Sequence, residues 1–218
     1  MNEGARLVKK ILKQDRKRQW KTHQMKTAND VVGFVHADTF VPTDVCSLVS
    51  GQLNDLRTVC VGFHTIIEYR DKTFWAISLH NSLKTHYIPA VLRPLSYIAG
   101  LRLLFGDQCM FMRLEDYFAV NGFDEQHSIM EDADMCLRLH NMHKNKTHCF
   151  GSQKHRSPGK IKLINRCVRT SGRRIDRIGG TITATCIHFI VSLSWFFGAS
   201  PKRIEHLYHS LYGGDRPR

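Results

Sequence analysis

The chain has 218 residues, 42% of them hydrophobic, which is enough for one domain with a buried core and excludes a wholly disordered chain. Its 32 Lys and Arg residues outnumber its 19 Asp and Glu residues, giving a formal net charge of +13. This excess predicts a polyanionic partner such as phosphate groups, nucleic acid or an anionic membrane face.

The cysteines and the first residues bear on the compartment. The seven cysteines include no CxxC pair and no regular spacing, which argues against a disulfide framework and a zinc knuckle and predicts reduced, mostly buried thiols. Residues 1–18 are basic and contain no apolar stretch of the kind found in secretory signals. We therefore expect an intracellular, cytoplasmic protein.

The first part of the chain predicts a basic segment followed by a strand, a helix and a strand. Residues 1–29 are basic, and within them residues 3–19 favour a short amphipathic helix or a strand with a loop. The apolar, β-branched run at 30–38 predicts a buried parallel strand that ends in polar residues. A helix is expected at 45–56 and a second strand at 58–63.

The middle of the chain predicts more helix than strand. Residues 74–105 are amphipathic, and Pro89 and Pro94 should divide them into two helical pieces. An apolar strand is expected at 108–112, and a short helix at 114–120 that ends at an Asn-Gly pair.

The last part predicts two helices separated by a basic loop. Residues 131–143 carry apolar residues at helical intervals behind an acidic first turn, and 144–162 predict a basic surface loop. Residues 178–201 contain no Lys, Arg, Asp or Glu and are long enough to span a bilayer. Because Gly, Thr, Ser and His dilute this stretch, we expect a buried helix or one lying on a membrane surface rather than a span.

His36 and Asp38 stand two residues apart at the end of the first predicted strand, so both can turn toward one pocket. A carboxylate with an imidazole suits a divalent cation such as Mn²⁺ or Mg²⁺, which leaves coordination positions open for substrate phosphates. The pair therefore predicts a metal site for a nucleotide diphosphate. The alternative is a hydrogen-bonded strand cap.

Two further clusters combine polar and acidic residues. Asp107 and Gln108 follow a turn glycine just before an apolar strand, where they could hydrogen-bond sugar hydroxyls or simply form the turn. Glu131 and Asp132 open a helix that also carries Asp134. Such crowding raises the pKa of at least one carboxyl, as a general base near neutral pH requires, although plain N-capping by Asp132 is the alternative.

Arg173 and Arg174 lie beside hydroxyl residues at 170–171 on a segment that we expect to be flexible. Two guanidinium groups in this setting form a natural clamp for a diphosphate leaving group. An ordinary basic loop has a similar composition.

Five short motifs follow one another in an order that is more specific than any one of them. The chain carries HADT at 36–39, GDQ at 106–108, NGF at 121–123, MED at 130–132 and TSGRR at 170–174. This order resembles a bacterial-type branch of glycosyltransferase family 2, whose members show HADT, GDQ, GGF, MED and TSxRRW. Segments 16–19 and 198–208 are similar to that branch's GRAxQ and GVSPERLxxLY.

The resemblance implies an α/β fold of the GT-A type, a Rossmann-like mixed sheet flanked by helices. It places a partial GT-A-like domain at 30–177, followed at 178–218 by an apolar helix and a basic tail. Members of the family use a nucleotide-activated sugar and a divalent metal, and they invert the anomeric centre. The implied activity is therefore transfer of a sugar from a nucleotide-diphosphate donor to an acceptor hydroxyl.

The resemblance also assigns roles to individual residues. Asp38 would be the metal ligand that corresponds to the last acid of the DXD motif, with His36 in place of the first acid. Asp132 would be the base that deprotonates the acceptor, with Glu131 as its neighbour.

Some features depart from the family pattern. Arg173 and Arg174 match the basic pair that binds the pyrophosphate, but Ile175 replaces the usual aromatic residue. The basic loop at 144–162 is expected to be an insertion. In place of the opening strand, helix and strand that hold the nucleotide base, the chain has a short basic segment. The resulting sheet edge should expose apolar surface and so reduce stability or require a partner.

These departures leave two alternatives to a glycosyltransferase. The first is a catalytically inactive relative that binds phosphate groups, polysaccharide or an anionic membrane, with 178–201 as the membrane contact. The second is a basic protein that binds nucleic acid, but no RNA- or DNA-binding module pattern is present, so we do not expect a nucleic-acid partner.

Overall fold

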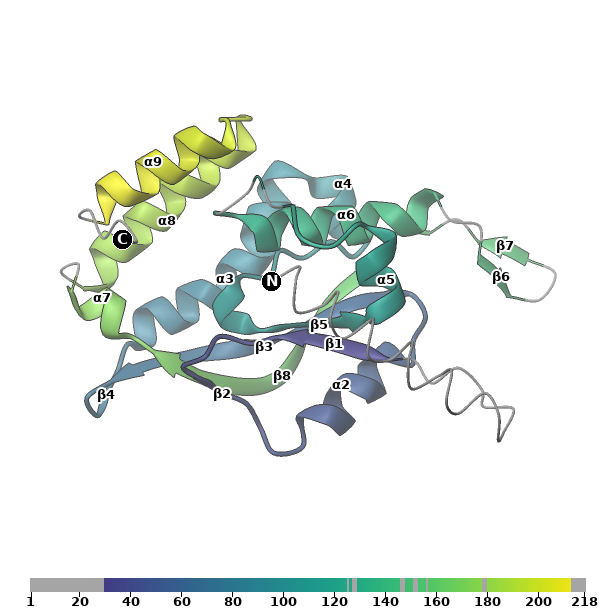
Figure 1. Cartoon of the computed structure of the whole chain (residues 1–218), viewed down its shortest axis with the longest axis horizontal. Coiled ribbons are helices and arrows are strands. Elements are labelled where there is room, and N and C mark those ends of the chain that lie inside the picture. The colour runs from purple at the N-terminus through teal and green to yellow at the C-terminus, as the bar shows by residue number, and fades with distance from the viewer. Residues whose placement is uncertain are drawn as a thin grey trace.

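The computed structural model describes most of the chain beyond the basic N-terminal segment. The described residues are 30–124, 126, 129–145, 148–150, 153–155, 157–177 and 180–212. They form a curled mixed sheet with helices on both faces (Figure 1). The amphipathic helix expected at 3–19 lies outside the described residues.

The sheet has six strands in the order β1-β5-β3-β8-β2, and the short β4 pairs with the end of β3. Its strands are β1 (Val31–Phe34), β2 (Thr39–Phe40), β3 (Thr58–Tyr69), β4 (Lys72–Thr73), β5 (Met110–Arg113) and β8 (Lys160–Ser171). Only β3 and β8 are parallel, and the other pairs are antiparallel. The prediction of an α/β protein with a mixed sheet is therefore confirmed.

The helices divide between the two faces of this sheet. They are α2 (Val45–Leu53), α3 (Trp75–Leu92), α4 (Pro94–Ile98), α5 (Leu114–Ala119), α6 (Glu131–Asn145), α7 (Arg173–Arg177), α8 (Thr181–Phe196) and α9 (Pro201–Leu211). Helix α2 lies on one face, α3 to α6 lie on the other, and α8 and α9 run side by side at the C-terminal end (Figure 1).

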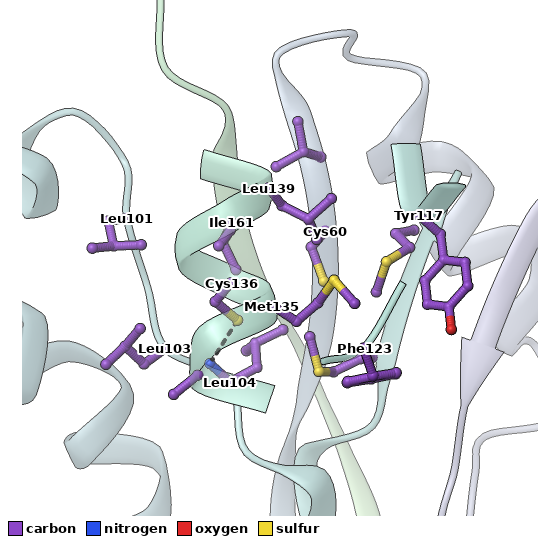
Figure 2. Close-up of a cluster of buried hydrophobic side chains, with 14 of the residues drawn as sticks. Cys60, Leu101, Leu103, Leu104, Tyr117, Phe123, Met135, Cys136, Leu139 and Ile161 are labelled. Atoms are coloured by element: carbon purple, nitrogen blue, oxygen red, sulfur yellow. Dashed lines mark hydrogen bonds between the residues drawn. The ribbon is translucent and has the colours of Figure 1, made fainter. Parts of the chain in front are cut away.

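The largest buried cluster lies between the sheet and α6. Figure 2 shows Met135, Cys136 and Leu139 of α6 beside Cys60 of β3 and Ile161 of β8, all buried. The backbone N–H of Leu104 donates to Cys136 Sγ at 3.3 Å in the same cluster. Because each buried side chain of this size contributes roughly 1.5–3 kcal/mol, the first turns of α6 are held firmly against the sheet.

Strand β1 differs from its prediction. It pairs antiparallel with β5 at an edge of the sheet, and its residues alternate between exposed and half-buried, with Val31 exposed. The prediction of a buried parallel strand is wrong because, among the described residues, no strand pairs with the outer side of β1. The expected exposed edge of apolar residues is present.

Only one of the two prolines in the predicted helical region ends a helix. Pro94 begins α4, but Pro89 lies inside α3. A proline within a helix leaves the carbonyl four residues earlier without its partner. Here the backbone N–H of Leu103 donates to that carbonyl, on Thr85, at 3.4 Å. The two predicted pieces are therefore a long helix with an internal proline and a single short turn.

The prediction of a basic loop at 144–162 is wrong for most of these residues. Helix α6 extends to Asn145, a hairpin of β6 (His148–Phe150) and β7 (Gln153–His155) follows, and β8 begins at Lys160. Strand β8 was not predicted, although its residues pair with almost the whole of β3.

The apolar segment at 178–201 forms helix α8, as predicted. One side packs on the protein through Ala184, Ile187 and Val191, and the other side is exposed. No helix in the described part of the chain is both long and apolar enough to cross a membrane. The cysteines described are all free, but only Cys60, Cys109 and Cys136 are buried, so they are less buried than predicted.

Candidate active site

A cavity of about 570 Å³ opens where the sheet, the start of α6 and the pair α8–α9 meet. We call it the central cavity. Every predicted site residue except Gln108 lines it, namely His36, Asp38, Asp107, Glu131, Asp132, Arg173 and Arg174. These residues come from four segments that are far apart in the sequence, so their convergence is a property of the fold.

Pairing between β2 and β8 joins the first motif to the last. The chain turns tightly after β1, with the Thr39 N–H donating to the His36 carbonyl at 3.1 Å. Thr39 then pairs with Thr170 across the two strands, and the Thr39 hydroxyl donates to Thr170 Oγ1 at 2.9 Å. The HADT turn and the TSGRR segment are therefore fixed side by side at one edge of the cavity.

Gly106 joins the GDQ turn to both His36 and Asp132. Its backbone N–H donates to the carboxylate of Asp132. A Cβ atom at Gly106 would lie 2.5 Å from His36 Nε2 and 3.1 Å from Asp132 Oδ2. A side chain here would therefore displace the His36 imidazole and crowd the Asp132 carboxylate, so glycine lets both groups approach the same point.

Asp132 is set up to exchange a proton near neutral pH. It lies in the first turn of α6, and burial raises its pKa to about 7, with further upward shifts from Glu131 and Asp107. The hydrogen bond from Gly106 and the charge of Lys84 oppose this rise. The predicted carboxyl with a raised pKa is therefore present, and desolvation is the main cause.

Hydrogen bonds hold both the carboxylate and the backbone carbonyl of Asp107 in place. Its carboxylate accepts a hydrogen bond from Asn81 Nδ2, and its carbonyl accepts one from the Thr65 hydroxyl at 2.9 Å. Asn81 is buried and also lines the cavity, and its Oδ1 has no hydrogen-bond partner among the described residues. Together these residues form a rigid polar floor.

Gln108 lies outside the cavity. Its side chain is fully buried, and its Oε1 accepts hydrogen bonds from the Thr85 hydroxyl and the Phe105 N–H, both at 3.0 Å. Gln108 therefore holds the 3₁₀ turn η1 (Gly106–Gln108) against α3, and its predicted contact with a sugar has no support in this position.

Lys84 is a cavity residue that the sequence analysis missed. It is buried, and its ammonium lies 3.9 Å from the centre of the Phe105 ring. Burial lowers the pKa of Lys84, while the charges of Asp107 and Asp132 raise it. Lys84 is the one Lys, Arg, Asp or Glu in the 18 residues of α3, and this lone charge was the available signal.

Arg173 and Arg174 lie on the short helix α7, directly after β8, rather than on the flexible segment that was expected. The Arg174 guanidinium donates to Tyr208 Oη of α9 at 2.8 Å. This contact ties Arg174 to α9, and both Arg174 and Tyr208 line the cavity.

The wall formed by α8 and α9 was also missed. Tyr208 and Tyr212 stack with their ring centres 4.4 Å apart, and the Tyr212 hydroxyl lies 2.7 Å from His188 Nε2. Burial is the main cause that lowers the pKa of His188, to about 3, so its imidazole is neutral. Aromatic rings with polar tips suit the apolar faces and hydroxyl groups of a sugar.

His36 and Asp38, the predicted metal ligands, both line the cavity. No group of three or more His, Cys, Asp or Glu side chains in the described part of the chain is arranged to hold a metal ion. Any cation at this position would have two protein donors and would take its remaining ligands from water or substrate.

Comparison with known proteins adds no assignment: no protein-family model matches the chain, and no curated protein matches it either. The functional assignment therefore rests on the geometry of the central cavity. This geometry combines a partly buried carboxyl with a raised pKa, two exposed guanidinium groups and a polar floor around one hollow of substrate size.

Proposed function

We propose that the protein is a glycosyltransferase with a GT-A-like fold that moves a sugar from a nucleotide diphosphate to an acceptor hydroxyl with inversion. The observation that carries this proposal is the central cavity, where Asp132 faces the same space as Arg173 and Arg174. A base and a diphosphate clamp around one hollow are what a single displacement of this kind requires.

Asp132 acts as the base in this proposal. The acceptor oxygen attacks the anomeric carbon, the bond from that carbon to the diphosphate oxygen breaks, and the acceptor proton passes to Asp132. A pKa of about 7 leaves a substantial fraction of the carboxyl ionised at neutral pH and makes it a stronger base than an ordinary aspartate. Glu131, adjacent to it, helps to keep that pKa raised.

Arg173 and Arg174 hold the diphosphate. Guanidinium groups pair with phosphate oxygens through two parallel hydrogen bonds, and these strengthen as negative charge develops on the leaving group. Asn81, whose Oδ1 has no partner among the described residues, and Asp107 are placed to bind sugar hydroxyls on the cavity floor.

A divalent cation fits the donor set at Asp38 and His36. Mg²⁺ and Mn²⁺ accept carboxylate ligands and keep several positions for water and phosphate oxygens, so two protein donors suffice. When bound, such a cation would neutralise charge on the diphosphate. Asp38 would supply the oxygen ligand, and His36 would either supply a nitrogen ligand or hydrogen-bond a phosphate.

Titration calorimetry with UDP and GDP, each with and without Mn²⁺, tests the donor site. We expect metal-dependent binding of at least one nucleotide, weakened at least tenfold in Asp38→Ala. The matched control is Asp44→Asn, a partly exposed acid that pairs with Arg166 outside the cavity. Absence of metal-dependent nucleotide binding contradicts the proposal.

Turnover tests the base. With a panel of nucleotide sugars and simple glycoside acceptors, release of nucleoside diphosphate should fall about 10²- to 10⁴-fold in Asp132→Asn, the range for loss of a general base. Asp44→Asn should turn over as the wild type does. Equal rates in Asp132→Asn and the wild type would remove Asp132 from the mechanism.

An inactive relative that binds phosphate groups is the second candidate. It is favoured by β1, which has no partner on its outer side among the described residues, on the side where the family holds the nucleotide base. In this case inorganic pyrophosphate would bind as tightly as UDP, Mn²⁺ would have no effect, and no sugar would be transferred.

A further inference from the structure

Helix α8 presents an apolar row to solvent on the side away from the central cavity. The row consists of Ile182, Cys186, Phe189 and Leu193 of α8 and of Phe197 at its C-cap, spaced three or four residues apart and all exposed. Phe197 is 76% exposed, and α8 contains no charged residue. A continuous row of exposed apolar residues has the composition of a contact surface.

A basic hollow lies at the C-terminal end of this row. It has a volume of about 520 Å³. Its lining combines three basic side chains, two hydroxyl residues and three apolar residues, namely Lys202, Arg203, His206, Ser194, Ser210, Ala199, Ile204 and Leu207. No acidic side chain in the described part of the chain lines it. Ser194 follows Ile190 by one helical turn, so the hollow adjoins the exposed face of α8.

We propose that the apolar row of α8 and the basic hollow form a docking surface for an anionic lipid bilayer. The row would enter the boundary between headgroups and acyl chains to a depth of about 5–10 Å, as amphipathic surface helices do. Lys202, Arg203 and His206 would bind the phosphate of an anionic headgroup. Helix α8 does not cross the bilayer, because its 16 residues are too few.

The net charge of the chain favours an anionic bilayer over a second copy of the protein as the partner of this surface. With a formal charge of +13, two copies repel each other, whereas an anionic bilayer attracts the protein and concentrates it at the surface. The basic hollow beside the row has the same preference, since a second copy would have to bring an acidic group to it.

The test uses cosedimentation with vesicles of phosphatidylcholine alone and of phosphatidylcholine with phosphatidylglycerol. The wild type should bind only the anionic vesicles. Phe189→Ser combined with Phe197→Ser should weaken this binding at least tenfold. The matched control is Phe40→Ser on β2, since the Phe40 ring is also 76% exposed but lies outside α8; it should bind as the wild type does.

A second pair of variants tests the hollow. Lys202→Gln combined with Arg203→Gln should weaken binding to the anionic vesicles severalfold and reduce its sensitivity to salt. Since all these residues are exposed, the variants should melt at the wild-type temperature.

Three results would overturn the proposal. The first is no binding of the wild type to anionic vesicles. The second is equal binding by the wild type and the double phenylalanine variant, which would leave charge alone as the cause. The third is a dimer in sedimentation velocity that this variant converts to a monomer, which would assign the row to a second copy. Nucleotide titration of the same variants reports separately on the central cavity.

Discussion

The two sides of helix α8 show how one element can serve two surfaces. The inner side contributes His188, Val191 and Ser192 to the central cavity, where burial and neighbouring charges shift proton affinities. The outer side carries only apolar and small uncharged residues and faces solvent. Reactive groups are thus confined to the protected side, and the exposed side has the chemistry of a contact.

Helix α3 repeats this division. Its inner side brings Asn81 and Lys84 to the cavity, and its outer side exposes an apolar row. The row consists of Trp75, Leu79, Leu83, Tyr87 and Val91. If the division reflects separate roles, substitutions on the inner sides should change proton affinity and turnover, and substitutions on the outer sides should change only association. The following predictions can break or sharpen that comparison.

The largest expected effect is on stability, in Asp132→Asn. The folded protein raises the pKa of this carboxyl from about 4 to about 7, so ionisation opposes folding above pH 4 and does so fully above pH 7. Asparagine removes that cost and still accepts the hydrogen bond from Gly106. We expect the variant to be more stable than the wild type by roughly 2–4 kcal/mol at pH 8 and equal to it near pH 4.

Denaturant unfolding of both proteins at the two pH values measures this difference. A variant that is less stable than the wild type at pH 8 would mean that Asp132 contributes to stability as an ordinary paired acid. A gain at pH 8 combined with lost turnover would show instead that the fold tolerates a destabilising carboxyl at this position for the sake of activity.

Gly106→Ala should reduce turnover about 100-fold. The new methyl group would lie within contact distance of His36 Nε2 and Asp132 Oδ2, and a displacement of about 1 Å at a catalytic group has an effect of this size. The control is Gly51→Ala in α2, where a Cβ meets no atom within 4 Å and alanine favours the helix. Full activity in Gly106→Ala would show that the imidazole and the carboxylate need not converge.

The sequence predicted which side chains line the cavity better than it predicted the structure around them. Asp132 and the arginine pair can be recognised in the sequence because each belongs to a short local motif. A carboxyl with other acids beside it is also visible in the sequence itself. Lys84 and Tyr212 belong to no such motif. They reach the cavity only because α3 and α8–α9 fold over the sheet, which depends on long-range packing.

Strand β8 and strand β1 explain two of the errors in the fold. In β8 the basic residues Lys160 and Lys162 fell within the predicted surface loop, but each occupies a partly exposed position in a strand whose Ile161 is buried. Basic side chains on one side of a strand are compatible with burial of the other. The apolar composition of β1 predicted a buried parallel strand. Whether a strand is buried within a sheet depends on the strands beside it, which come from other parts of the chain.

Lys84→Met should move the pH dependence of turnover. The ammonium of Lys84 lowers the pKa of Asp132, so its removal should raise that pKa and shift the rise in rate to higher pH. At pH 7 the rate should therefore fall, because a smaller fraction of the carboxyl is ionised. Lys162→Met, which removes a partly exposed lysine paired with Asp55, is the control. A lower rate with an unchanged pH profile would assign Lys84 a packing role only.

Tyr208→Phe should produce the smallest change, because it removes only one hydroxyl from the outer rim of the cavity. The Tyr208 hydroxyl accepts the hydrogen bond that directs Arg174, and at an exposed position such a bond contributes about 1 kcal/mol or less. The ring keeps its stacking on Tyr212, so we expect KM for the nucleotide sugar to rise about 2- to 5-fold with kcat nearly unchanged.

Tyr87→Phe removes a hydroxyl from the exposed row of α3 and should leave both constants as they are. A change in kcat rather than KM in Tyr208→Phe would mean that Arg174 acts on the transition state more than on the bound donor, and that the rim belongs to the reacting side of the molecule. Loss of vesicle binding in Tyr208→Phe would contradict the division altogether, because a cavity residue would then serve the outer surface.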